Sequence, residues 1–309
     1  MIESGSHSAG GDRVSFSLPA NTAMRWEAPH PSLAWLIGDY FVFDSEGPEV
    51  LGARSPMLPS WPIIRFALAR EPMSIDAPGI CWSPLPEAGF YGSASRVLHH
   101  TSNGGVTIGV NLTPAGVARL LNLDVSKFRD RMVSLDELIG ERSAEIVSLL
   151  RSSDQGPAVK AILDEFFLRE MPAPTEDEEL IVALHKLLLD DAIRSAADLA
   201  RELGLARHTL RRLSLKRFGF APSLLIARTR FLRSLIAIRT AGGGSYRDID
   251  EAYTDSSHFL RDCDRFLGLT ARRFLSLEFP FLDAIIRVRG QVLGTALPTL
   301  GPGLYLKDA

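Results

Sequence analysis

Side chains that can bind nucleic acid are concentrated in one short segment. They are Arg207, His208, Thr209, Arg211 and Arg212. Arginine can donate two hydrogen bonds to a guanine in the major groove, and histidine can donate one to a base edge. Leu210 and Leu213 are spaced to lie on one side of a helix, which leaves His208, Arg211 and Arg212 on the other. We therefore expect an amphipathic helix over about 207–217 whose polar side meets DNA.

A supporting helix is needed to hold this one against DNA, and the preceding segment predicts one. Ser195 is suited to cap its first turn. Apolar residues follow at helical spacing: Ala196, Leu199, Ala200 and Leu203. Gly204 can adopt the left-handed conformation that ends such a helix and turns the chain. The pair predicts a helix-turn-helix, although an ordinary helical hairpin has the same spacing.

Charge is distributed unevenly along the 309 residues, whose formal net charge is −3. Residues 192–279 hold 16 Lys plus Arg against 9 Asp plus Glu, whereas residues 1–191 hold 15 against 26. An arginine-rich segment joined to an acidic one indicates a polyanionic partner for the basic part. No apolar run approaches the roughly 20 residues that span a bilayer, and no signal peptide is evident at the start. Cys81 and Cys263 are the only cysteines, so we expect a cytoplasmic protein that has no membrane partner and needs no disulfide.

Two motifs follow each other in this basic region. The first includes Thr209, Leu210, Arg212, Leu213, Gly219 and Pro222, and continues into an apolar helical segment. The second consists of a Tyr-x-Asp-x-Ser-His-Phe core at 253–259 and an aromatic-x-Gly-x-Thr ending at 266–270. Together they resemble the DNA-binding half of AraC/XylS transcription regulators, with its two helix-turn-helix units, over about residues 195–274.

The resemblance implies which side chains meet DNA. Base edges would be faced by His208, Arg211 and Arg212 in the first unit and by Ser256, Ser257 and Arg261 in the second, with His258 beside them. Arg207 and Thr209, at a helix start, are better placed for phosphate. The chain departs from the family pattern at Ala206, where a serine cap is usual, at Ser214, where an aromatic is usual, and in a second supporting helix at 246–252 that is two residues short. The second unit is therefore the less secure reader of bases.

The N-terminal half is punctuated by Pro and Gly and predicts a β-rich domain. Short apolar stretches at 33–37, 40–43, 63–68 and 106–110 are typical of strands, and Thr113-Pro114 predicts a helix start. Three segments, Leu58–Ser60, Asn111–Val117 and Arg131–Gly140, more weakly resemble an uncharacterised cupin-like regulatory domain. We predict an α+β fold: a tail at 1–12, a β-rich sensor domain at 13–153, a helical connector at 154–191, a double helix-turn-helix domain at 192–279, and a terminal helix with a tail at 280–309.

The function predicted is that of a sequence-specific transcription regulator, an activator rather than a repressor, and not an enzyme. Its expected partners are double-stranded DNA, RNA polymerase, a small-molecule effector and a second copy of the chain. Several aromatics either line an effector site or belong to the core: Trp35, Tyr40, Trp61, Trp82, Phe90 and Tyr91. His99 and His100 are adjacent and would point to opposite faces of a strand, so no metal or cofactor is expected. An adaptor protein with a degenerate second unit, or a cupin-like enzyme, remains an alternative.

Overall fold

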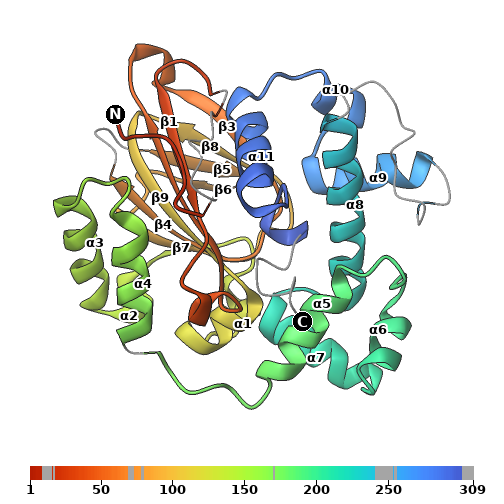
Figure 1. Ribbon diagram of the computed structural model, residues 1–309. Helices are drawn as coiled ribbons and strands as arrows, with labels where there is room; N and C mark the ends of the chain where they lie inside the picture. The colour runs from red at the N-terminus through yellow and green to blue at the C-terminus, as the bar shows by residue number, and fades with distance from the viewer. Residues whose placement is uncertain are drawn as a thin grey trace.

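Two antiparallel β-sheets form the N-terminal half of the chain in the computed structural model (Figure 1). The structure describes residues 1–8, 16, 18–68, 73–77, 80–169, 171–240, 253 and 256–300. The larger sheet has the order β1-β2-β9-β4-β7-β10, and the smaller has the order β3-β8-β5-β6. The strands are β1 (Thr22–Glu27), β2 (Ile37–Ser45), β3 (Ala53–Met57), β4 (Ile63–Leu68), β5 (Ser74–Ala77), β6 (Ile80–Trp82), β7 (Ala88–Tyr91), β8 (Leu98–Ser102), β9 (Gly105–Leu112) and β10 (Met132–Ser134).

Strand β2 shows how the larger sheet divides its side chains between two faces. Successive side chains of a strand point to opposite sides, so Tyr40 and Val42 face one way and Phe41 and Phe43 the other. Tyr40 and Val42 enter the main hydrophobic core. Phe41 packs in a separate cluster that also contains Val288 from the C-terminal end of the chain. Both faces of this sheet are therefore covered by apolar side chains.

Helices that follow strand β9 cover the outer face of the larger sheet (Figure 1). They are α1 (Pro114–Gly116), α2 (Asp136–Ile139), α3 (Arg142–Ser152) and α4 (Val159–Arg169). Leu163 and Phe166 of α4 belong to the same core cluster as Ile64 and Phe66 of β4. The predicted start at Thr113 is confirmed, because its hydroxyl accepts a hydrogen bond from the backbone N–H of Gly116 at 3.0 Å.

The α+β prediction is confirmed by this arrangement, but one predicted strand is wrong. Residues 33–37 were expected to be extended, whereas a 3₁₀ turn (Pro31–Leu33) precedes β2, which begins at Ile37. Pro31 fixes the backbone of the first position of this turn, and the His30 side chain accepts a hydrogen bond from the N–H of Ser32. These local constraints outweigh the apolar composition of the segment.

The C-terminal half is helical. Its helices are α5 (Glu178–Leu188), α6 (Ala196–Glu202), α7 (Arg207–Phe218), α8 (Pro222–Thr240), α9 (Ser256–Leu267), α10 (Ala271–Leu275) and α11 (Pro280–Leu293). The Ser195 cap is confirmed, because its hydroxyl accepts from the N–H of Asp198, and Gly204 has a φ of +62°. The expected supporting helix at 246–252 lies outside the described residues. Within those that are described, no helix is both long and apolar enough to cross a bilayer.

The two halves share one hydrophobic core around Trp61, which lies between β3 and β4. The guanidinium of Arg228, on α8, lies 4.0 Å from the Trp61 ring centre and donates to the carbonyl of Ser60 at 3.3 Å. The rings of His185 and Phe218 pack edge-on against Trp61, each with centroids 5.6 Å away. The main cluster accordingly runs from the sheets into α5, α7 and α8. The domain boundaries at 153, 191 and 279 stay predictions.

His185 should make the stability of the protein depend on pH. Burial, and next the charge of Arg228, lower the pKa of this imidazole from 6.5 to about 4. Below pH 6.5 the His185 imidazole binds a proton in the unfolded chain but not in the folded chain. The free energy of unfolding therefore falls as the pH drops from about 6.5 towards about 4. The expected loss between about pH 7.5 and about pH 5 is ~2 kcal/mol from this residue alone.

Denaturant titrations at the two pH values would measure this loss. His185→Gln should reduce the pH dependence by that amount, and His208→Gln, at an exposed position, should leave it unchanged. Equal pH dependence in the wild-type protein and in His185→Gln would contradict the assignment.

Candidate DNA-binding surface and ligand cavity

Helix α7 presents an exposed basic face. Arg207, His208, Arg211 and Arg212 are all exposed, and Thr209 is half-buried. On the opposite face, Leu210, Ser214 and Phe218 are buried, as the helical spacing predicts. The structure thus brings together the four outward side chains singled out in the first unit. Their contact with bases stays a prediction.

The orientation of α7 is fixed at its C-terminal end. Gly219 ends the helix with a φ of +84°, a left-handed conformation that favours glycine. The Ser214 hydroxyl donates to the carbonyl of Phe220 at 2.6 Å. The serine that stands where the family has an aromatic therefore forms a hydrogen bond with the turn after α7. Arg217 forms two hydrogen bonds with Asp177, at 2.7 and 2.9 Å. Burial alone would raise the pKa of Asp177, but the hydrogen bonds and charge of Arg217 outweigh it and lower that pKa.

Helix α9 exposes a smaller polar face. Ser257 and Arg261 are exposed, and nothing is described of the Ser256 side chain. His258 is half-buried, with its Nε2 atom 3.3 Å from the Arg230 guanidinium and its ring edge-on to Tyr253. This imidazole is engaged with its own domain rather than with the outer face. It stays a candidate for DNA contact, but one with a clear packing role.

The Tyr253 position of the second motif has a structural task. Its hydroxyl donates to Asp262 of α9 at 2.8 Å, and Arg230 of α8 lies 3.3 Å from the same carboxylate. The rings of Phe259 and Phe266 stack on Phe231 of α8. These contacts fix α9 to α8, the long helix that also carries α7 at its other end (Figure 1). Helix α8 is therefore the rigid element that sets the spacing between the exposed faces of α7 and α9.

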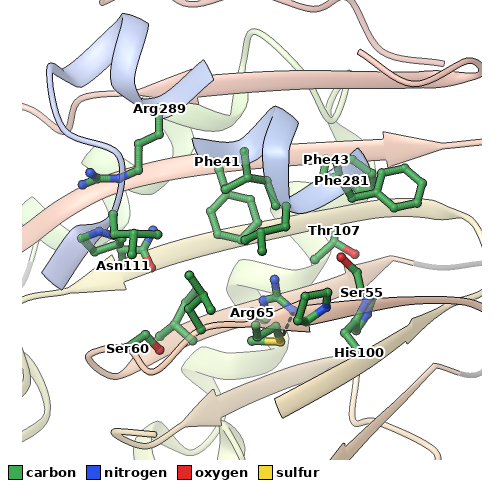
Figure 2. Close-up of a pocket in the computed structure, with 18 of the residues that line it drawn as sticks. Phe41, Phe43, Ser55, Ser60, Arg65, His100, Thr107, Asn111, Phe281 and Arg289 are labelled. Carbon is green, nitrogen blue, oxygen red and sulfur yellow. Dashed lines mark hydrogen bonds between the residues drawn. The ribbon is translucent and has the colours of Figure 1, made fainter. Parts of the chain in front are cut away.

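A cavity of about 150 Å³ lies between the two sheets and the C-terminal helix α11. Figure 2 shows its lining, which is mainly apolar and aromatic. The walls include Phe41 and Phe43 of β2, Met57 of β3, and Phe281 and Ile285 of α11. The cavity resembles in size an engineered apolar cavity that accepts benzene, so it suits a ligand with a body of about that size.

Arg65 of β4 places a positive charge in this apolar cavity. Its guanidinium lies 5.5 Å from the ring centre of Phe41 and 5.8 Å from that of Tyr91, and one N–H points to the Met57 sulfur at 3.5 Å (Figure 2). Its Nε has no hydrogen-bond partner, and no carboxylate pairs with it within the described part of the chain. Burial lowers the pKa of Arg65. Arg65 as a whole is half-buried, but its Nε is enclosed, and a cation partly shielded from water without an anion is costly. The site therefore has the features of one that receives an anion.

His100 of β8 lies in the same cavity and adds no positive charge. Burial, and next the charge of Arg65, lower the pKa of His100 to about 3. The imidazole is therefore neutral near pH 7 and can exchange a hydrogen bond with a ligand. In the ranges that the structure describes, no group of three or more His, Cys, Asp or Glu side chains could hold a metal ion.

The sequence indicated a ligand site in this half but not the residues that line it. None of the six aromatics considered for that role lines the cavity. Tyr40, Trp61, Phe90 and Tyr91 are buried in the core, while Trp35 and Trp82 are half-buried. The lining depends instead on side chains that strand alternation turns inward and on a helix that lies at least 170 residues further along the chain. No local pattern could identify it.

Comparison with known proteins adds distant structural likenesses. No family model and no curated protein matches the chain. Similar solved structures include ToxT from Vibrio cholerae with a bound unsaturated fatty acid (13% identity, 72% of this chain and 91% of that chain, TM-score 0.42) and ToxT in an apo form (13%, 84% and 98%, TM-score 0.41). Another is the AraC-like transcriptional activator CuxR (14%, 69% and 78%, TM-score 0.23). CuxR is of the class that the motifs resemble, but at these identities and TM-scores the likeness carries no argument about function.

Proposed function

We propose that the protein is a transcription regulator of the AraC/XylS type that binds specific DNA sequences through α7 and α9. The observation that carries this proposal is the exposed basic face of α7, a helix that packs against α6 and ends at Gly219. Arg211 is exposed at its centre, and Arg261 is exposed on α9. Two such helices read consecutive major grooves on one side of the duplex, about 34 Å apart.

Transcriptional activation through contact with RNA polymerase, and dimerisation, belong to this proposal as expectations carried by the family resemblance. The protein would act in the cytoplasm, on double-stranded DNA. An adaptor that binds no DNA is the competing function. A bare adaptor has no need of four exposed basic or imidazole side chains on one face of a helix, whereas a DNA reader does.

Arg211→Ala is expected to weaken specific binding by ~1–3 kcal/mol and to relax the preference at one base pair. The binding sequence would be selected from a random DNA library with the purified protein, and affinity measured by titration at fixed salt. Arg201→Ala is the matched control, because Arg201 is an exposed arginine of α6 that pairs with Asp198 and Glu202. If Arg211→Ala binds the selected and a scrambled sequence as the wild type does, α7 is not a base-reading helix.

We further propose that a small apolar molecule with an anionic group occupies the cavity and modulates DNA binding. The cavity volume favours a body about the size of benzene, and the unpaired guanidinium of Arg65 favours a carboxylate. Benzoate and octanoate are therefore the first ligands to test, with their methyl esters as uncharged counterparts.

A further inference from the structure

Helix α11 has two buried faces that pack against different halves of the molecule. Leu282 and Ile286 belong to a hydrophobic cluster with Phe259 and Phe266 of α9. Leu58 and Val97 of the β half also belong to it, and the backbone N–H of Val97 donates to the carbonyl of Phe266 at 2.7 Å, so α11 adds to a direct contact. Val288 and Leu293 belong instead to the cluster formed by β-sheet residues such as Phe41. In Figure 1 the helix lies between the sheets and α8. It therefore forms a layer that joins the second unit to the β domain.

The contact with the β domain is secured by a buried ion pair. Arg289 of α11 donates to one Asp39 carboxylate oxygen from Nε at 3.1 Å and from Nη2 at 2.8 Å. The other oxygen accepts from the Trp26 indole at 3.0 Å and from the Asn111 amide at 2.5 Å. The Arg289 and Asp39 side chains are 1% and 0% exposed. Near the other end of the helix, Phe281 packs edge-on against Phe43 of β2, with centroids 5.4 Å apart.

The contact with the DNA-binding half is equally specific. Asp283 of α11 pairs with Arg239 at the end of α8, with N–O distances of 2.5 and 3.0 Å. Leu282 belongs both to the hydrophobic cluster around α9 and to the wall of the cavity. A displacement of α11 at the cavity therefore changes the packing of α9, because interiors are too dense to absorb it.

We propose that α11 is a clamp that holds the second helix-turn-helix unit against the β domain, and that the cavity under α11 controls how tightly it holds. The regulatory half of this inference rests on the proposed function, whereas the clamp does not. An occupant that touches Phe281, Leu282 and Ile285 strengthens the clamped state, because it adds contacts present only when α11 lies on the sheet. The first unit is fixed separately, through Trp61 and Arg217, so the clamp acts on the second unit selectively.

Amide hydrogen exchange on the full chain, without DNA, tests the clamp. Phe281→Ala removes a sheet contact of α11 and leaves no buried charge. It should speed exchange several-fold in peptides from 256–275 and leave peptides from 207–218 unchanged. Arg289→Met should act in the same direction more strongly. Gln291→Ala, at an exposed position on the same helix, is the control and should change neither segment.

A filled cavity should give the opposite result. Ser55 of β3 lines the cavity across from α11, and Ser55→Phe places a ring in it. This variant should slow exchange in 256–275, whereas Ser148→Phe, exposed on α3, should not. The clamp is overturned if Phe281→Ala leaves 256–275 unchanged or speeds 207–218 equally, and control by the cavity is overturned if Ser55→Phe does not slow 256–275. Because no DNA is present, failure of operator binding would leave these outcomes unaffected.

Discussion

Asp39→Ala is expected to lower the free energy of unfolding by about 3–5 kcal/mol, the largest loss from any single charge we consider. The substitution leaves the Arg289 guanidinium buried without its anion. It also removes the acceptor of the Trp26 and Asn111 side chains. An unpaired buried charge and unsatisfied buried donors each carry a desolvation cost that the folded state cannot recover from water.

Urea denaturation of the wild-type protein and the variant measures this loss. Asp76→Ala is the matched control, because Asp76 pairs with Arg54 in a contact whose side chains are 31% and 58% exposed. Exposed pairs of this kind contribute about 0–1 kcal/mol. A loss for Asp39→Ala no larger than that for Asp76→Ala would show that the buried pair does not hold α11 to the sheet.

Arg65→Met is expected to abolish stabilisation by carboxylate ligands and to leave the empty protein as stable as before or more so. Removing the charged partner of a buried ligand carboxylate costs ~2–5 kcal/mol of binding, which is a loss of more than about thirtyfold in affinity. The ligand-free protein no longer holds a half-buried cation without a carboxylate partner, and Met keeps an unbranched apolar side chain in place of the aliphatic part of arginine. A residue that raises ligand affinity but lowers the stability of the ligand-free protein is typical of a binding site.

Thermal unfolding with benzoate or octanoate, and with their methyl esters, measures both effects. The acids should raise the melting temperature of the wild-type protein and not that of Arg65→Met, while Arg54→Met, exposed on β3, should respond as the wild type does. If neither acid stabilises the wild-type protein, or if Arg65→Met still responds to them, the carboxylate site is refuted.

The first helix-turn-helix unit could be predicted because residues close together in the sequence determine its helices and its turn. Ser195 caps α6, Gly204 ends it, and Leu210 faces inward while Arg211 faces out, each as neighbouring residues dictate. Side-chain spacing and capping act within a turn or two of a helix. The strand at 40–43 and the cap at Thr113 could be predicted for the same reason. Residues 33–37 could not, because their composition suits a strand and only the turn at Pro31 decides otherwise.

The cavity and the clamp could not be predicted because they depend on pairs far apart in the sequence. Asp39 and Arg289 are 250 residues apart, and nothing near either one indicates its partner. Arg65 has the spacing of an ordinary strand residue that alternates with Ile64 and Phe66, so its place in a cavity appears only once the sheets and α11 are assembled. The helix after residue 280 was predicted, but its two buried faces were not.

Helices α7 and α9 are both proposed to enter grooves of one DNA segment, and hydroxyl-radical footprinting tests this most directly. The wild-type protein on its selected sequence should protect two segments on one face of the duplex, about 10 base pairs apart. Arg211→Ala should weaken protection of one segment and Arg261→Ala that of the other. A single protected segment, or two that both variants weaken equally, would contradict the claim that each helix reads its own groove.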